Sequence, residues 1–155
     1  MRQVPRILAI VFLAGCASTD YSDIANSQAV ISNLEVAEVG KAGTYKHQLD
    51  IRFDYSIEDY KELPGLYICN VMFSMSEDRL ITKANERAQC KIDSESGSVS
   101  IKRATPLSSS AGYSTEERRQ MALPLEYHVT IHQMKARGAS VIIGESEPRY
   151  LDLKE

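Results

Sequence analysis

The stretch QLDIRFDYSI, residues 48–57, alternates apolar and polar side chains over its whole length. Successive side chains of a β-strand point to opposite faces of the sheet, so this pattern predicts a strand with one buried and one solvated face. Such strands are typical of an antiparallel sheet that is covered on one side. The predicted buried set is Leu49, Ile51, Phe53, Tyr55 and Ile57.

Five further segments have strand patterns: residues 30–39, 66–75, 125–131, 140–144 and 149–153. The second of these is apolar on both parities, which predicts a central strand buried on both faces. The last two close the chain as one bent strand or as two, and Pro148 confines them to an edge. Cys90 and Ile92 are expected to form a hairpin with Val99 and Ile101 around the turn residues 94–97.

Two short helices are expected between these strands. Residues 76–88 carry Leu80, Ile81 and Ala84 at helical spacing. Ser114 and Glu117 fit a capping box for a helix over residues 115–123, which Pro124 would end. An exposed edge strand is the alternative for this second segment.

Together these segments predict an all-β fold, an antiparallel immunoglobulin-like β-sandwich of about seven strands with one or two short helical turns. The chain has no tryptophan, so the buried tryptophan of antibody domains is excluded. Cys69 and Cys90 are also closer in sequence than the usual inter-sheet pair. The prediction therefore concerns architecture and names no family for this domain.

The N-terminus has the pattern of a secretory signal. Arg2 and Arg6 precede an apolar run over residues 7–14, which is too short for a transmembrane helix. Leu13-Ala14-Gly15-Cys16 then resembles the lipobox of bacterial lipoproteins. The resemblance covers residues 1–16 and implies cleavage before Cys16, attachment of a diacylglyceryl group to its thiol and acylation of the new N-terminus. Alanine at position 17 implies sorting to the outer membrane.

These features divide the chain into a signal peptide (1–15), a lipidated cysteine with a flexible tether (16–28) and a β-sandwich domain (29–155). Loss of Arg2 and Arg6 lowers Lys+Arg from 18 to 16 against 21 Asp+Glu, so the net charge changes from −3 to −5. An acidic domain of this kind argues against a nucleic-acid partner. With Cys16 lipidated, Cys69 and Cys90 are expected to form a disulfide in an oxidising compartment.

The sequence offers weak candidates for a chemical site. His128 and His132 share the polar face of a predicted strand with Thr130, about 13 Å apart, which is too far for one metal ion. We expect them to be solvated, and His47 has no evident partner. Ser108-Ser109-Ser110 lies in a loop without a nucleophile elbow. No motif predicts a catalytic residue, a cofactor or a metal.

Tyrosines near predicted loops are the candidate partner-binding residues, because tyrosine offers contact area at low entropic cost. They are Tyr45, Tyr60 and Tyr113. The alternative is that they only shield the rim of the core.

The favoured function is that of a lipoprotein on the periplasmic face of the outer membrane, which acts by binding as an assembly accessory of an envelope or secretion complex. Its partners would be the membrane, through the lipid, and an envelope protein. One alternative is an inhibitor or small-ligand binder, which needs a protruding loop at residues 105–114 or an apolar cavity. The other is a small envelope hydrolase with His128 or His132 as base.

Overall fold

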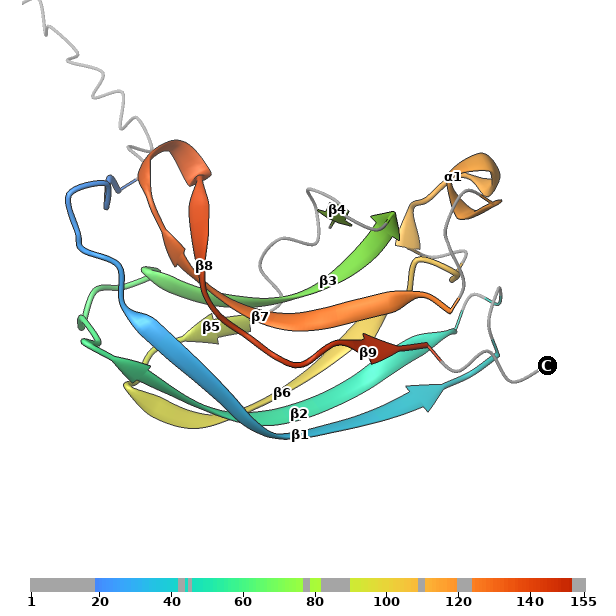
Figure 1. The fold of residues 1–155 in the computed structure, drawn as a ribbon, viewed down its shortest axis with the longest axis horizontal. Coiled ribbons are helices and arrows are strands. Elements are labelled where there is room, and N and C mark those ends of the chain that lie inside the picture. Colours follow the sequence, from blue (N-terminus) through green and yellow to red (C-terminus); the bar gives the residue numbers. More distant parts are fainter. Residues whose placement is uncertain are drawn as a thin grey trace, which may run out of the picture.

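The structure is a computed structural model and describes residues 19–41, 44, 46–76, 79–81, 90–108, 111–119 and 124–151. Two curved sheets face each other, with the core between them (Figure 1). Every strand pair is antiparallel. Among the described residues, no helix is long and apolar enough to cross a membrane.

Sheet A has three strands in the order β1-β2-β6. They are β1 (Gln28–Val39), β2 (Gln48–Glu58) and β6 (Ser96–Ala104). Sheet B has the order β4-β3-β7-β8, with β5 beside β3 and β9 beside β7. Its strands are β3 (Tyr67–Ser76), β4 (Arg79–Ile81), β5 (Cys90–Ile92), β7 (Glu126–Met134), β8 (Ser140–Glu145) and β9 (Arg149–Tyr150).

This topology is that of an immunoglobulin-like sandwich. The order β1-β2-β6 corresponds to strands A, B and E, and β4-β3-β7-β8 corresponds to C′, C, F and G. The predicted fold class is thus confirmed. Strands β5 and β9, of three and two residues, are short additions to sheet B.

The alternating face of β2 forms the centre of the core, as predicted. Leu49, Ile51 and Phe53 are at most 2% exposed. They belong to one hydrophobic cluster with side chains from β3 and β7. From the facing sheet come Tyr67, Cys69, Val71, Phe73, Tyr127, Val129 and Ile131.

Strand β1 keeps its apolar side chains on the core through a bulge. Its register against β2 shifts between Ser32 and Glu35, and Asn33 adopts a positive φ of 50°. The extra residue lets the inward parity change, so that both Ile31 and Leu34 pack against the core. Asparagine tolerates this left-handed conformation better than most residues.

The predicted hairpin of residues 90–92 with 99–101 is wrong. Strand β5 pairs with β3, whereas β6 pairs with β2, so the chain crosses from sheet B to sheet A between them. Cys90 lies directly opposite Cys69, and the disulfide joins these neighbouring strands. The sequence indicates two strands on either side of a turn. Which strands they pair with depends on contacts between residues that are far apart in the chain.

The predicted capping box is present at the start of helix α1 (Thr115–Arg119). The Ser114 amide donates to Glu117 Oε2 at 2.7 Å, and the Glu117 amide donates to Ser114 Oγ at 3.1 Å. These reciprocal bonds confirm the helix over the edge-strand alternative for residues 115–119. The end expected at Leu123 lies outside the described residues.

The other predicted helix, over residues 76–88, is wrong where the structure describes it. Residues 79–81 form β4, which pairs with the end of β3. An adjacent strand edge supplies backbone partners there, and this tertiary pairing overrides a helical spacing that lacks a strong cap. Residues 77–78 and 82–88 lie outside the described residues.

The flexible tether expected to extend to Gln28 ends earlier. Tyr21 is 8% exposed and belongs to the core cluster. Ser27 is buried, and its amide donates to the buried Gln133 side chain at 2.8 Å. Residues 21–27 are therefore part of the folded body, because they bury apolar surface and satisfy their backbone polar groups against β7.

Candidate functional site

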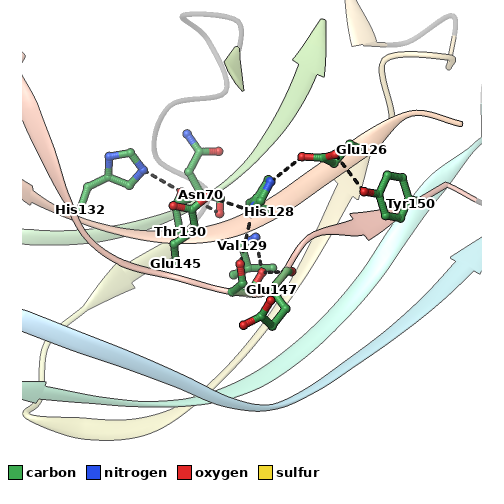
Figure 2. Close-up of polar contacts among 10 residues, drawn as sticks. Asn70, Glu126, His128, Val129, Thr130, His132, Glu145, Glu147 and Tyr150 are labelled. Carbon is green, nitrogen blue, oxygen red and sulfur yellow. Dashed lines mark hydrogen bonds and ion pairs between the residues drawn. The ribbon is translucent and has the colours of Figure 1, made fainter. Parts of the chain in front are cut away.

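The outward face of β7 carries a row of polar side chains, His128, Thr130 and His132 (Figure 2). Its inward residues fill the core, so the alternation of the strand directs these three away from sheet A. Thr130 is fully buried and His132 is 8% exposed. The expectation of solvated histidines is thus wrong, since this part of the outer face is shielded from water.

Hydrogen bonds define the orientation of His132. Thr130 Oγ1 lies 2.8 Å from Nε2, and Ser140 Oγ on β8 lies 3.2 Å from Nδ1. The Thr130 hydroxyl donates its proton to the carbonyl of Asn70 at 3.3 Å. It must therefore accept from Nε2–H, and in the neutral ring Nδ1 is then the acceptor for the Ser140 hydroxyl. A chain of donors thus runs from Ser140 through His132 and Thr130 to the β3 backbone.

Burial lowers the pKa of His132 from its usual value of 6.5. Removal from water disfavours the charged imidazolium, and no cation-stabilising partner is among the causes of the shift. The contacts with Thr130 and Ser140 are both satisfied by this neutral ring. This imidazole can accept a proton only weakly, but its acceptor nitrogen points to an exposed serine.

His128 has a different environment. Its Nε2 lies 2.9 Å from Glu126 Oε1, and its Nδ1 lies 2.8 Å from Glu145 Oε1. Each ring nitrogen therefore faces a carboxylate. Through its contact with Glu145, His128 links β7 to β8.

Glu126 contacts both His128 and Tyr150. Tyr150 on β9 donates its hydroxyl proton to Glu126 Oε2 at 3.0 Å. Hydrogen bonds from His128 and from Tyr150 lower the pKa of the Glu126 carboxyl. The same contact with the Glu126 carboxylate raises the pKa of Tyr150. The cluster thus stabilises the ionised carboxylate and fastens the short strand β9 to β7.

Neither histidine has the full set of partners of a catalytic triad. His132 faces hydroxyl groups, whereas His128 faces carboxylates. Of the loop serines, Ser108 is buried, and Ser109 and Ser110 lie outside the described residues. Within the described ranges, no three His, Cys, Asp or Glu side chains are grouped so as to hold a metal ion.

A hydroxyl–imidazole–carboxylate chain occurs elsewhere, at His47. Thr105 Oγ1 lies 2.5 Å from Nδ1, and Glu38 Oε1 lies 2.6 Å from Nε2. Thr105 and His47 are both fully buried, so no substrate can reach the hydroxyl. This group joins the ends of β1, β2 and β6 and is structural. Sequence reasoning missed it because its members are up to 67 positions apart in the chain.

The structure does not gather the candidate tyrosines into one patch. Tyr60 is half-buried and stacks on Tyr67, with ring centroids 5.2 Å apart. Tyr113 is buried in the core cluster and comes two residues before α1, whereas Tyr60 follows the end of β2. Helix α1 and that end of β2 lie at opposite ends of the sandwich (Figure 1). Tyr45 lies outside the described residues. Of the described pair, only Tyr60 offers a partner any surface.

The two cysteine predictions have different outcomes. Cys69 and Cys90 form a disulfide, with 5.2 Å between their Cα atoms. The predicted lipidation site, Cys16, lies outside the described residues. The disulfide is a link within sheet B rather than one between the sheets.

Two surface features bear on ligand binding. The loop expected to protrude at residues 105–114 is packed down where the structure describes it, since Thr105, Ser108 and Ala111 are buried. A hollow of about 390 Å³ lies on the three strands of sheet A, and Asp50, Arg52 and Lys102 are among its lining residues. Val36, Ile51 and Ile101 also line it, so the hollow offers apolar surface beside these charges.

No protein-family model, no curated protein and no solved structure matches this chain.

Proposed function

We propose that the protein is a bacterial lipoprotein, acylated at Cys16, which acts by binding as an assembly accessory of an envelope or secretion complex. The observation that carries this proposal is the sequence Leu13-Ala14-Gly15-Cys16, which resembles a lipobox. It precedes Tyr21, the first buried residue in the part of the chain that the structure describes, by only a few positions. Ala17 favours the outer membrane by the same resemblance, with the domain on its periplasmic face.

The body of the protein is compatible with this location. A disulfide persists in an oxidising, extracytoplasmic compartment and is rare in the cytosol. The mature chain is acidic, so the acyl groups rather than a basic patch would hold it at the bilayer. Two or more acyl chains are needed for stable anchoring.

A binding role is favoured over catalysis by how the polar groups are used. The imidazoles of His47, His128 and His132 each have both nitrogens in contact with groups of the same chain. The outer face of sheet A, in contrast, carries charged groups beside the hollow, of which Arg52 and Lys102 are exposed and Asp50 is partly buried. Restriction to a membrane surface would raise the effective concentration of a weak contact there.

The anchoring half of the proposal is tested by Cys16→Ser. We expect this variant to lose both metabolic acyl labelling and membrane retention, while Ser18→Ala, as a matched control, keeps both. The variant Ala17→Asp should remain acylated and move from the outer to the inner membrane. Unchanged membrane retention of acyl-free Cys16→Ser would contradict the proposal.

The binding half is tested by cross-linking in detergent-solubilised membranes. Arg52→Glu reverses a charge beside the hollow on sheet A, and Ser56→Ala on the same strand face serves as its control. A defined envelope complex should be recovered with the control and lost with Arg52→Glu. Recovery of the protein as a lone monomer in every case would contradict the binding role.

A hydrolase is the second candidate, and the Ser140–His132 contact is the observation that favours it. The neutral ring presents its acceptor nitrogen to an exposed hydroxyl, which is the first requirement of serine activation. Labelling by a fluorophosphonate that is lost in both Ser140→Ala and His132→Gln would support this candidate. Equal labelling of the wild-type protein and both variants would exclude it.

A further inference from the structure

The chain leaves the folded body at one end of the sandwich, here called the anchor end. It consists of residues 21–27, 63–66 and 135–139. Tyr21 donates its hydroxyl proton to the carbonyl of Pro64, and the ammonium group of Lys135 donates to the carbonyl of Ile24 at 2.6 Å. The Met134 amide donates to the Leu66 carbonyl at 2.8 Å. These bonds hold the three segments together.

The side chain of Gln133 holds residues 21–27 against the body. Its side chain is fully buried, its Oε1 accepts from the Ser27 amide, and its Nε2 donates to the carbonyl of Ala25 at 3.0 Å. Ser27 Oγ also lies 2.7 Å from the hydroxyl of Tyr67. The segment from Tyr21 onward is therefore fixed to the body, so the connection to the lipid is counted from Cys16 to Tyr21.

This docking shortens the connection to the lipid. If residues 16–28 were all flexible, they could span roughly 40 Å. With Tyr21 fixed, the five steps from Cys16 to Tyr21 span at most about 18 Å. The opposite end, which carries α1, is separated from the anchor end by the length of β1 (Figure 1). A strand of 12 residues is about 40 Å long.

The charge of the body opposes its lying flat on the membrane. The mature chain carries 21 acidic against 16 basic side chains once Arg2 and Arg6 are removed. Anionic lipid gives a leaflet a negative surface potential, which repels an acidic body over about a Debye length. The short connection between the lipid and one end of the body, together with electrostatic repulsion between the rest of the body and the leaflet, favours an upright orientation.

We infer that the protein stands end-on to the bilayer, with the anchor end facing the lipid and the α1 end pointing away. This inference rests on the proposed lipidation of Cys16. It has a consequence for binding, since the outer face of sheet A would be presented sideways, clear of the lipid surface. The ligand of the anchor end is the membrane in which the acyl chains insert.

Energy transfer to headgroup-labelled lipid tests this orientation. The acylated full-length protein is placed in vesicles of phosphatidylethanolamine and phosphatidylglycerol, with a donor dye on Leu63→Cys at the anchor end or on Glu116→Cys in α1. Both side chains are exposed. Transfer should be about twofold or more stronger from position 63, because β1 separates the two ends by about 40 Å.

A matched variant tests the cause of the orientation. An insertion of about twelve Gly/Ser residues between Asp20 and Tyr21 gives a flexible tether whose length is comparable to that of the body. The difference between the two dye positions should then largely disappear. Tyr21→Ala should reduce it partly by freeing the docked segment, whereas Tyr21→Phe, which keeps the ring, should change it less.

The outcomes separate this inference from the proposed function. Acyl labelling and vesicle flotation are measured on the same sample and report lipidation alone. An acylated, floating protein with equal transfer from positions 63 and 116, or stronger transfer from 116, would overturn the orientation and leave the lipoprotein proposal intact. If the difference in energy transfer between positions 63 and 116 persists after the insertion, the short tether is not the cause of the orientation. Absence of acylation would overturn both proposals.

Discussion

The outward faces of the two sheets differ in how they treat polar side chains. On β2 of sheet A, Arg52 and Ser56 are exposed, as the alternating sequence suggests. On β7 of sheet B, Thr130 is fully buried and His132 nearly so (Figure 2). Both strands show the same period of two, so periodicity identifies the core face without deciding whether the other face is wet.

This difference has an energetic consequence. An exposed polar group can exchange a protein partner for water, whereas a buried one must keep its partner or lose the free energy of its hydrogen bond. The contacts of Thr130 and His132 should therefore matter more to stability than those of the exposed polar groups on the outward face of sheet A, such as Arg52 and Ser56. Four experiments can break or sharpen this comparison.

The largest effect is expected from the disulfide, which constrains sheet B and has no counterpart on sheet A in the described residues. The double variant Cys69→Ala, Cys90→Ala should lower the free energy of unfolding by about 3 kcal/mol on the chain-entropy model for a loop of roughly this length. Urea unfolding gives the measurement. Reduction of the wild-type protein is the control and should cause a similar loss; a change below about 1 kcal/mol would contradict the account.

The next largest effect on stability is expected at Thr130, in the row of polar side chains on the outward face of β7. Thr130→Val keeps the shape of the side chain but leaves Nε2–H of His132 without its acceptor, which should lower the free energy of unfolding by about 1–3 kcal/mol. Ser100→Val on the exposed face of sheet A is the control and should stay within about 0.5 kcal/mol of wild type. Equal stability of the two variants would show that the buried and the exposed outer faces do not differ in what their polar groups contribute to the free energy of unfolding.

The pH dependence of stability follows from the lowered pKa of His132. The unfolded chain takes up a proton near pH 6.5 while the folded ring stays neutral, so stability is full above that value and falls as the pH drops through it. The loss levels off below the folded-state pKa, and its limiting slope is about 1.4 kcal/mol per pH unit. The difference in stability between wild type and His132→Asn should show this trend between about pH 7.5 and 5.5. A difference that does not vary with pH would show that His132 is not shielded from water.

The smallest effect is expected at the exposed rim of sheet B. Tyr150 is 54% exposed, so Tyr150→Phe should change the free energy of unfolding by less than about 0.5 kcal/mol. The Glu126 carboxyl loses a hydrogen bond in this variant, and its pKa should rise. A carboxyl-detected NMR titration gives the direction, and an unchanged Glu126 titration would contradict the contact.

Part of the candidate site was predictable from the sequence. The alternation over residues 125–131 correctly placed His128, Thr130 and His132 on one face of a strand. Their partners could not be predicted, because Ser140, Glu145 and Tyr150 come from strands that reach β7 only through the hairpin and the bend after it. The buried His47 group was missed for the same reason, since Glu38 and Thr105 lie on separate strands of sheet A and its adjoining loop.

The sequence by itself determined what depends on neighbouring residues: the strand over residues 48–57, the capping box at Ser114 and the two inward-facing parities of β2 and β7. These signals are local, because side-chain direction repeats every second residue and a cap spans one helical turn. Only the tertiary structure decided that β5 joins β3, that residues 21–27 dock on Gln133 and that the outer row of β7 is buried. Those outcomes depend on which distant segments meet, and a periodic pattern contains no information about the partner that will cover it.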